Sequence, residues 1–455
     1  MRTNFTEEQL KDPRISEVNR IIRSCVHCGL CTAVCSSYVI LADERDSPRG
    51  RIYLMKEMFE SAKKPSIEVR HHIDRCLSCL SCMTTCPSGV DYMHLVDHAR
   101  EYIEERGFRP RLAKIVRMML ATSIPYPRRF WWMLNLGRVT RPFRKILQVF
   151  GLREFANMME MVPSKIPTFH LLKKGEFFSR SSKKQGRVIL LGGCAQQVLR
   201  PSINKSTIRF LNRCHIDVVI PSKSVCCGAL VHHLGREKDT KYFIKQNIDA
   251  WIELIEQGSI NAILINASGC GTMVKDYGYI LQDDLEYAKK AQRVSALTRD
   301  ISEFASSADI GSPMRWSSLK VAYHSACSLQ HGQKIHDEPK KLLTKAGFTL
   351  VDIPDGHLCC GSAGTYNILQ SEIATQLRSK KVANIKSQNP HVVAAGNIGC
   401  ITQIAAGIDI PVVHTIELLD WAYGGPVPLG LEGLSHMVKD IPKSSRIAED
   451  YLITN

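Results

Sequence analysis

The sequence predicts a multidomain α+β protein in which an α-helical, cysteine-rich module precedes a duplicated α/β unit. Two observations predict this fold class. Eight cysteines between positions 25 and 86 form two runs of the pattern C-x2-C-x2-C-x3-C. Eight more, between positions 194 and 400, form two copies of a second spacing beside strand-like segments. The 455 residues are enough for about three domains of ordinary size.

The first eight cysteines have the spacing by which ferredoxin-type modules hold two [4Fe–4S] clusters. In that pattern, three closely spaced thiolates hold one cluster and the fourth reaches the other. One cluster is therefore assigned to Cys25, Cys28, Cys31 and Cys86. The second is assigned to Cys76, Cys79, Cys82 and Cys35. Disulfides and zinc are the alternatives, although zinc sites usually pair C-x2-C units across a longer gap.

Residues 1–110 should form this module, with helices between its cysteine runs. The forty residues separating Cys35 from Cys76 are too many for a tight hairpin. Ser47 can cap a helix there, and Pro48 suits its first turn. A second helix should end near Gly107. The apolar faces of the two helices are Ile52, Met55 and Phe59, and Met93, Val96 and Ile103.

Ser36 follows the first cysteine run at a position where proline would be usual, as Pro87 follows the second. The proline ring helps the chain to turn and is not a ligand. We therefore expect the cluster to tolerate this serine.

Residues 111–185 should form a basic connector rich in aromatic side chains. From Arg106 to Arg153 there are twelve Lys or Arg and no Asp or Glu, which accounts for most of the net charge of +16. Arginines interleaved with aromatic residues resemble a membrane-surface segment. The alternatives are a linker packed on the protein itself, or docking on a partner. Nucleic acid is disfavoured because no base-reading module accompanies the segment. The aromatic residues are Phe130, Trp131, Trp132, Phe143 and Phe150.

Two α/β repeats should follow, over residues 186–316 and 317–425. The first cysteine and the following Cys-Cys-Gly unit are separated by 32 residues in both copies. The last cysteine follows that unit after 43 residues in one copy and 40 in the other. Matching spacing and matching strand–helix order indicate a duplication. The repeat cysteines are Cys194, Cys226, Cys227 and Cys270, then Cys327, Cys359, Cys360 and Cys400.

The repeat cysteines follow the carboxyl ends of predicted strands, which line the ligand crevice of parallel α/β sheets. Four thiols per repeat should therefore converge, beside glycines that allow close backbone approach. These are Gly228, Gly271, Gly361 and Gly399. An additional cluster and a cysteine-lined structural or subunit-contact pocket both stay open. Cys214, which lies outside these sets, should pack in a core.

The sequence shows neither a secretory signal at its N-terminus nor a membrane-spanning stretch. The first fourteen residues have no apolar segment of the kind found in secretory signals, and no stretch approaches twenty uninterrupted apolar residues. We expect a cytoplasmic location, with peripheral contact at the inner face of the cytoplasmic membrane as an option. Residues 426–455 should form a surface tail.

Several strings together resemble the family of iron–sulfur subunits of bacterial glycolate oxidase (glycolate dehydrogenase). They are SCVHCGLCTAVC, DSPRGRIYLMKEM, RCLSCLSCMTTCPSGVDY, NASGCGTMVKDYGYIL, SALTRDISE, HLCCGSAGTYNILQ and NIGCITQI. The resemblance covers nearly the whole chain. Related motifs occur in anaerobic glycerol-3-phosphate dehydrogenase, heterodisulfide reductase and lactate-utilisation proteins.

The resemblance implies an electron-transfer subunit with no catalytic residue of its own. Flavoprotein partners carrying FAD would oxidise glycolate to glyoxylate, and this chain would pass electrons toward a quinone. The chain itself shows no flavin-binding signature and no convincing G-x-G-x-x-G motif. The alternatives are the equivalent subunit of a lactate, other 2-hydroxy-acid or glycerol-3-phosphate dehydrogenase, and, more distantly, a structural iron–sulfur protein that binds nucleic acid.

The sequence departs from the heterodisulfide reductase relatives, in which each complete repeat ends in C-x-x-C and an extra thiolate helps to hold a noncubane cluster. Met273 and Gln403 occupy the corresponding positions here. A five-thiolate cluster is therefore not expected in either repeat, whereas four cysteines could still hold a cubane.

Overall fold

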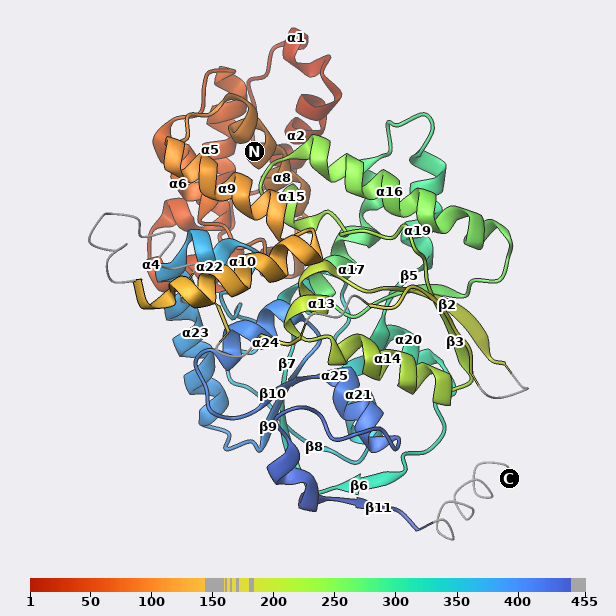
Figure 1. Cartoon of the computed structure of the whole chain (residues 1–455). Helices are drawn as coiled ribbons and strands as arrows, with labels where there is room; N and C mark the ends of the chain where they lie inside the picture. Colours follow the sequence, from red (N-terminus) through yellow and green to blue (C-terminus); the bar gives the residue numbers. More distant parts are fainter. Residues whose placement is uncertain (144–158, 160–161, 164–165, 169–171, 180–183, 443–455) are drawn as a thin grey trace.

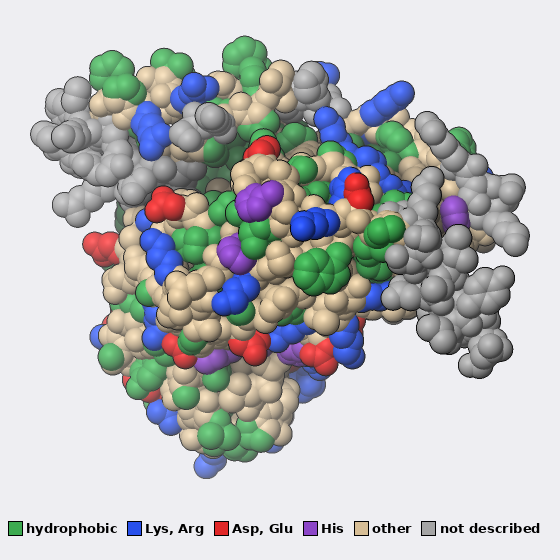
Figure 2. All heavy atoms as spheres, turned by 90° about the horizontal axis from the view of Figure 1, so that it is seen from below, with side chains coloured by type: hydrophobic (Ala, Val, Ile, Leu, Met, Phe, Trp, Pro, Cys, Tyr) green, Lys and Arg blue, Asp and Glu red, His purple; other side chains and the backbone are tan. Residues whose placement is uncertain are grey.

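The computed structural model describes residues 1–143, 159, 162–163, 166–168, 172–179 and 184–442. The N-terminal helical module lies at one end of the molecule, and the connector helices and two α/β units follow it (Figure 1). Basic and acidic side chains are mixed over the face seen in Figure 2. No helix in the described ranges is both long and apolar enough to cross a lipid bilayer.

The N-terminal module is built from short helices around a shared apolar core. Its helices are α1 (Glu7–Leu10), α2 (Pro13–Ser24), α3 (Leu30–Ala33), α4 (Ser36–Leu41), η1 (Glu44–Asp46), α5 (Pro48–Ser61), α6 (Ile67–Asp74), α7 (Ser81–Thr85) and α8 (Tyr92–Arg106). Both helices expected between and after the cysteine runs are present, as α5 and α8. The Ser47 hydroxyl accepts a hydrogen bond from the Gly50 N–H, which caps α5. The core of the module includes Val18, Ile21, Ile22, Ile52, Met55, Phe59, Leu95, Val96 and Ile103.

The connector folds back on the protein along one face only. Its helices are α9 (Arg111–Ser123) and α10 (Pro127–Thr140), followed by η2 (Arg141–Phe143). Phe130 is buried in a cluster that includes Val198 of the first repeat. Trp131 is half-buried and donates a hydrogen bond to the Pro167 carbonyl. The expected packing of the aromatic side chains on the protein therefore applies to these two residues.

The opposite face of α10 is exposed. The Trp132 side chain is 69% exposed, and Val139 and Phe143 are also exposed. Four arginines of α10 and η2 are exposed as well: Arg128, Arg129, Arg138 and Arg141. Phe150, the last of the five aromatic residues predicted to belong to this segment, lies outside the described residues.

The first repeat contains a five-stranded sheet of order β1-β3-β2-β4-β5. Strands β2 to β5 are parallel, and β1 pairs antiparallel with β3. The strands are β1 (Gly175–Phe177), β2 (Gly186–Leu191), β3 (Ile216–Ile220), β4 (Ala262–Ile265) and β5 (Thr298–Asp300). The helices are α13 (Cys194–Leu199), α14 (Ser202–Arg213), α15 (Ala229–His233), α16 (Glu237–Glu256), α17 (Ser268–Lys275), α18 (Tyr277–Ile280), α19 (Ala288–Leu297) and α20 (Ile301–Ser307).

The second repeat has the same strand arrangement in a parallel sheet of order β10-β9-β7-β8. Its strands are β7 (Lys320–His324), β8 (Thr349–Val351), β9 (Val392–Ala395) and β10 (Val412–His414). Its helical segments are η3 (Ser328–Gly332, a π-helical turn), α21 (Glu338–Lys345), α22 (Tyr366–Leu369), α23 (Ser371–Lys386), α24 (Ile398–Ala405) and α25 (Thr415–Ala422). The order β8-β7-β9-β10 matches β3-β2-β4-β5, as expected for a duplication.

The described part of the expected tail is more ordered than predicted. The helical turn η4 (Glu432–Met437) leads into β11 (Val438–Asp440), which pairs antiparallel with β6 (Arg315–Ser317). Leu431 is fully buried in the repeat core. Neither β6 nor β11 lies in an apolar run that would mark it as a strand in the sequence.

The helical module is fixed directly to both repeats. His94 on α8 contacts Asp276 of the first repeat through Nε2 at 3.0 Å and stacks on Tyr279. The Tyr366 hydroxyl of the second repeat donates a hydrogen bond to the Arg75 carbonyl. At Gly235, an added Cβ would lie 2.5 Å from the Arg100 carbonyl oxygen, so only glycine fits at this contact.

Candidate metal centres

Four cysteines of the helical module line one cavity near the surface: Cys25, Cys28, Cys31 and Cys86. We call them the first set. Gly29 has a φ of +81°, which lets the chain turn from Cys28 into α3. The Cys28 side chain is exposed, whereas Cys25 is buried. The Val90 N–H lies 3.5 Å from Cys86 Sγ and can donate to it.

Cys35, Cys76, Cys79 and Cys82 line a second cavity. We call them the second set. Cys82 also borders the first cavity, so the two sets are adjacent. The Ser78 N–H donates to Cys76 Sγ at 3.4 Å, and the Tyr92 hydroxyl donates to the same sulfur at 3.8 Å. Each predicted group of four therefore lines one cavity, and Cys82 borders both cavities.

The donors of both sets fit a metal–sulfur group. All the cysteines are free thiols. Burial raises the pKa of Cys31 to about 11, and burial also raises the pKa of Cys82 well above its ordinary value. Such thiols ionise readily only when a positive group replaces the proton, as a metal does. The N–H groups directed at sulfur suit thiolate ligands as well.

The second set lies beside a buried network of basic side chains. The Arg51 side chain is 1% exposed and reaches the Ser37 hydroxyl at 3.0 Å and Cys35 Sγ at 4.0 Å. Asp46 balances this charge, because it accepts hydrogen bonds from Arg51 and from Arg75. No comparable basic group is buried at the first set among the described residues.

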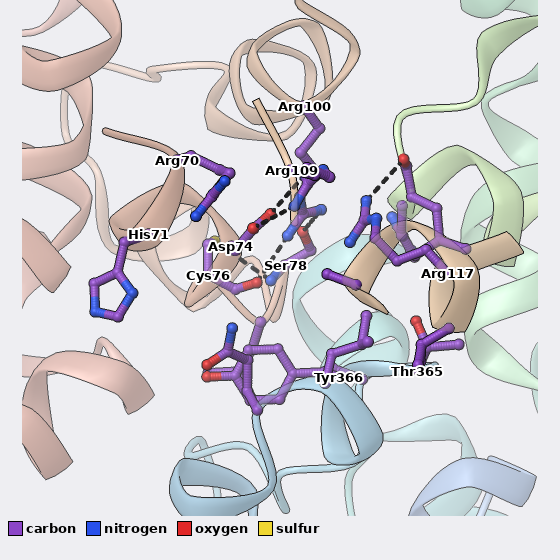
Figure 3. A pocket seen from close by; sticks show the side chains of 18 of the residues that line it. Arg70, His71, Asp74, Cys76, Ser78, Arg100, Arg109, Arg117, Thr365 and Tyr366 are labelled. Carbon is purple, nitrogen blue, oxygen red and sulfur yellow. Dashed lines mark hydrogen bonds and ion pairs between the residues drawn. The ribbon is translucent and has the colours of Figure 1, made fainter. Parts of the chain in front are cut away.

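A polar cleft adjoins the second set on the side of α6 and α8 (Figure 3). Arg100 donates to the Cys76 carbonyl at 2.7 Å and to the Ser78 hydroxyl at 2.6 Å. Arg109 pairs with Asp74 at 2.7 Å. These bonds hold the loop that carries the second set and add positive charge next to it.

The repeat cysteines converge as the strand positions predict. Cys194 and Cys226 lie 3.5 Å apart through their sulfurs. In the second repeat, neighbouring thiols interact in the order Cys327, Cys359, Cys360, Cys400. All eight line a single cavity of about 400 Å³, together with Cys79 of the second set.

This shared cavity is largely apolar away from its thiols. Side chains of the connector line it opposite the repeats, among them Met119, Ile124, Phe130 and Leu134. The glycines of the Cys-Cys-Gly units allow the chain to turn there. Gly361 has a φ of +86°, and an added Cβ would lie 2.5 Å from the Ala374 carbonyl oxygen.

The second repeat and the second set are in direct contact. Cys79 and Leu77 pack in one cluster with Cys327 and Cys359. The buried Ser36 hydroxyl accepts a hydrogen bond of 3.0 Å from the Cys359 N–H. Ser36, expected only to be tolerated, is therefore part of this contact. Proline could not make the bond, because it has no hydroxyl.

The positions noted in the sequence as lacking a fifth thiolate are occupied by side chains with other partners. The Gln403 amide donates to the Ala374 carbonyl and accepts from Asn367. Met273 is buried in the core of the first repeat. Cys214 is also buried in a repeat core, as expected, and burial raises its pKa to about 12.

The sequence did not indicate His324 as a candidate metal ligand. One of its ring nitrogens, Cys360 Sγ and Cys400 Sγ lie within 4.8 Å of one another. The sequence signal was weak, since a histidine three residues before a cysteine matches no usual ligand spacing at this site.

Comparisons with known proteins agree with this architecture. The model of a 4Fe-4S dicluster domain matches residues 24–90, and the model of a cysteine-rich CCG domain matches residues 188–275 and 321–405. The glycolate oxidase iron-sulfur subunit of Escherichia coli K12 is 40% identical, over 93% of this chain and 99% of that protein. A probable glycolate oxidase iron-sulfur subunit of Bacillus subtilis is 28% identical, over 92% of this chain and 99% of that protein.

Two further similarities are more limited. Lactate utilization protein A of Bacillus velezensis is 27% identical, over 51% of this chain and 99% of that protein. A crystal structure of a hypothetical protein from Helicobacter pylori aligns with a TM-score of 0.53 at 10% identity, over 96% of this chain and 78% of that one. The latter supports the fold alone.

Proposed function

This chain belongs to the family of glycolate oxidase iron–sulfur subunits, and from that premise we propose that it carries electrons from flavin-bearing partner subunits, which oxidise glycolate to glyoxylate, toward a quinone. The chain is the electron-transfer part of an oxidoreductase complex. The lactate-utilisation alternative is less favoured, because that similarity covers only 51% of the chain. The arginines of the polar cleft beside the second set are engaged by an internal ion pair and a backbone carbonyl, so we assign no substrate-binding role to this cleft.

We propose that the first set and the second set each hold one [4Fe–4S] cluster. When bound, the two clusters supply one-electron transfer. The residues around them differ in a way that suggests a direction. Cys28 is exposed, with the apolar Val26 and Leu30 exposed beside it, which suits docking of a flavoprotein. Cys79 instead faces the shared cavity inside the molecule.

The observation that carries the proposal is the contact of Cys79 with Cys327 and Cys359. It extends the series of cysteine sites from the surface, through the second set, to the repeats. We propose the eight repeat cysteines as an additional cluster site at the end of this series. The apolar lining that α9 and α10 contribute to the shared cavity suits a lipophilic acceptor such as a quinone.

The exposed face of α10 supports peripheral contact with an anionic membrane. Trp132 and Val139 of α10 and Phe143 of η2 provide exposed apolar side chains, and Arg128 and Arg129 lie on α10. Apolar side chains flanked by arginines are typical of segments that lie in the membrane interface. This contact would bring the lipid phase near the connector side of the shared cavity.

The test is to separate electron entry from electron delivery in the reconstituted complex. Cys79→Ser should leave flavin reduction by glycolate at its wild-type rate, measured by anaerobic stopped-flow absorbance. The same variant should lose nearly all reduction of a quinone analogue. Cys214→Ser, in a repeat core away from both sets, serves as the matched control and should retain delivery. Equal loss of flavin reduction and delivery in Cys79→Ser would contradict the relay.

A further inference from the structure

His324 is a buried side chain with no hydrogen-bond partner in the part of the chain that the structure describes. It is the last residue of β7 and is 1% exposed. Neither ring nitrogen makes a hydrogen bond to any of the described residues. Buried imidazoles are nearly always hydrogen-bonded, because leaving a polar group unsatisfied costs about 1–3 kcal/mol. The exception at His324 therefore requires an explanation.

The imidazole lies next to two of the repeat thiols. One ring nitrogen, Cys360 Sγ and Cys400 Sγ are all within 4.8 Å of one another. Metal–sulfur bonds of about 2.3 Å and metal–nitrogen bonds of about 2.0 Å bring ligands of one metal within roughly 4 Å of each other. A small adjustment of the side chains would thus allow all three to bind one metal group.

The two repeats differ at this position. His324 lies three residues before Cys327, and Leu191 lies three residues before Cys194. Each is the last residue of the equivalent strand, β7 or β2. Leu191 packs in the apolar core of the first repeat. The nitrogen donor is therefore specific to the second repeat.

We propose that the second repeat binds an iron–sulfur cluster through its cysteines, with His324 as a nitrogen ligand. This inference rests on the proposed function in one respect, namely that the repeat cysteines hold a cluster. Four thiols and one imidazole offer five donors, which is one more than a tetrahedral zinc site takes. Cys79 of the second set packs against Cys327 and Cys359, so an electron carrier would lie alongside.

The nitrogen ligand would have a consequence for electron flow. An imidazole ligand, unlike a further thiolate, adds no negative charge to the ligand set, and histidine ligation in Rieske centres raises the reduction potential. Lys381, which is also buried, adds positive charge near these thiols. Both effects would raise the reduction potential of the site in the second repeat, so an electron would favour this site over the other cysteine sites nearby.

The experiment uses anaerobically purified full-length protein labelled with ¹⁵N-histidine. Pulsed electron paramagnetic resonance of the reduced protein should show coupling to a directly bound ¹⁵N. The coupling should disappear in His324→Leu, which reproduces the residue of the first repeat. It should persist in His331→Leu, a matched control at a buried histidine of the same repeat that contacts Thr84 instead. Iron per chain should exceed the roughly eight atoms of two [4Fe–4S] clusters in the wild type.

Three results would overturn the inference. Iron above eight per chain without ¹⁵N coupling would exclude His324 as a ligand. One zinc per chain with about eight irons would exclude a cluster in this repeat. Coupling that survives in His324→Leu would assign the nitrogen to another histidine. His324→Cys, which supplies a thiolate, should retain the additional iron without the coupling even where the leucine variant fails to fold. Loss of the eight irons themselves would instead contradict the proposed function.

Discussion

The Ser36 hydroxyl accepts a hydrogen bond of 3.0 Å from the Cys359 N–H, although the two residues lie 323 positions apart in the chain. Ser36 directly follows Cys35 of the second set, and Cys359 belongs to the second repeat. A single bond therefore connects the backbones that carry two neighbouring groups of cysteines. It sets the position of the Cys-Cys-Gly turn relative to the helical module.

Replacing Ser36 by alanine should destabilise this contact. The Cys359 N–H would be left buried without an acceptor, which costs about 1–3 kcal/mol. Denaturant unfolding of the anaerobic protein should show a loss of that size. Ser24→Ala is the control, because the Ser24 hydroxyl bonds only a carbonyl of its own helix. An unchanged unfolding midpoint in Ser36→Ala would show that the bond contributes little.

Replacing Arg51 by methionine should lower the reduction potential at the second set. A positive charge about 8 Å away stabilises an added electron by about 2 kcal/mol at an effective dielectric constant near 20. This equals roughly 90 mV for one electron. Redox titration followed by electron paramagnetic resonance should detect the shift at the second set and a much smaller one at the first.

The matched variant for this test is Arg51→Lys, which keeps the charge near Cys35 and should move the potential far less. Arg51 also bonds Asp46, so iron content should be measured in both variants. Equal shifts at both sets, or equal shifts in both variants, would argue against a local electrostatic effect.

The contact of His94 with the first repeat should weaken at high pH. Burial alone would lower the pKa of His94, but hydrogen bonds to Asp276 and Asp91 outweigh it and raise that pKa to about 10. Its stabilisation should therefore be complete below the unfolded value near 6.5 and be lost as the pH rises through about 10. Wild type should exceed His94→Gln by about 2 kcal/mol at pH 6 and by much less at pH 10.

Thermal and denaturant unfolding between pH 6 and pH 10 would measure this difference. His336→Gln is the control, since His336 is exposed and takes no part in the contact between His94 and Asp276, so its replacement should change the stability little. A gap between wild type and His94→Gln that stays constant over this range would contradict a charged His94.

The exposed face of α10 should bind anionic vesicles. Trp132→Ser combined with Val139→Ser removes apolar side chains worth about 2 kcal/mol or more on burial, so vesicle affinity should fall by about tenfold or more. Co-sedimentation with vesicles of mixed neutral and anionic phospholipid would measure it. Trp316→Ser, at an exposed tryptophan of β6, should have no effect. Trp131 is left intact because it supports the fold through Pro167.

The local structure of this protein was largely predictable from its sequence. Helix α5 follows from a serine cap, a proline in the first turn and apolar residues on one face, all of which are local signals. The strands β2, β3, β4, β7, β8 and β9 were each recognisable as apolar runs before or between cysteines. Because the spacing of the repeat cysteines occurs twice, their thiols were expected to converge.

The contacts between distant segments were not predictable in the same way. Nothing near Ser36 indicates that its hydroxyl meets Cys359, because that approach depends on how a whole module packs. His324 likewise becomes unusual only once its burial and its lack of partners are known. The sequence of the connector was ambiguous for a related reason, because an amphipathic helix does not specify whether its apolar face meets protein or lipid. In α10, one face packs on the protein through Phe130, and another exposes Trp132.

The cysteines of the first set are more exposed than those of the second set, and this difference should affect how the protein is damaged by oxygen. Dissolved oxygen and peroxide reach Cys28 from the surface, whereas Cys76 and Cys82 are shielded by the protein. Oxidation of cysteine ligands follows their accessibility. If the first set holds the cluster that receives electrons, as proposed, damage should begin at this outermost centre and interrupt electron entry, while the buried ligands of the second set stay intact. Repair would then require rebuilding only the outermost cluster rather than replacing the whole polypeptide.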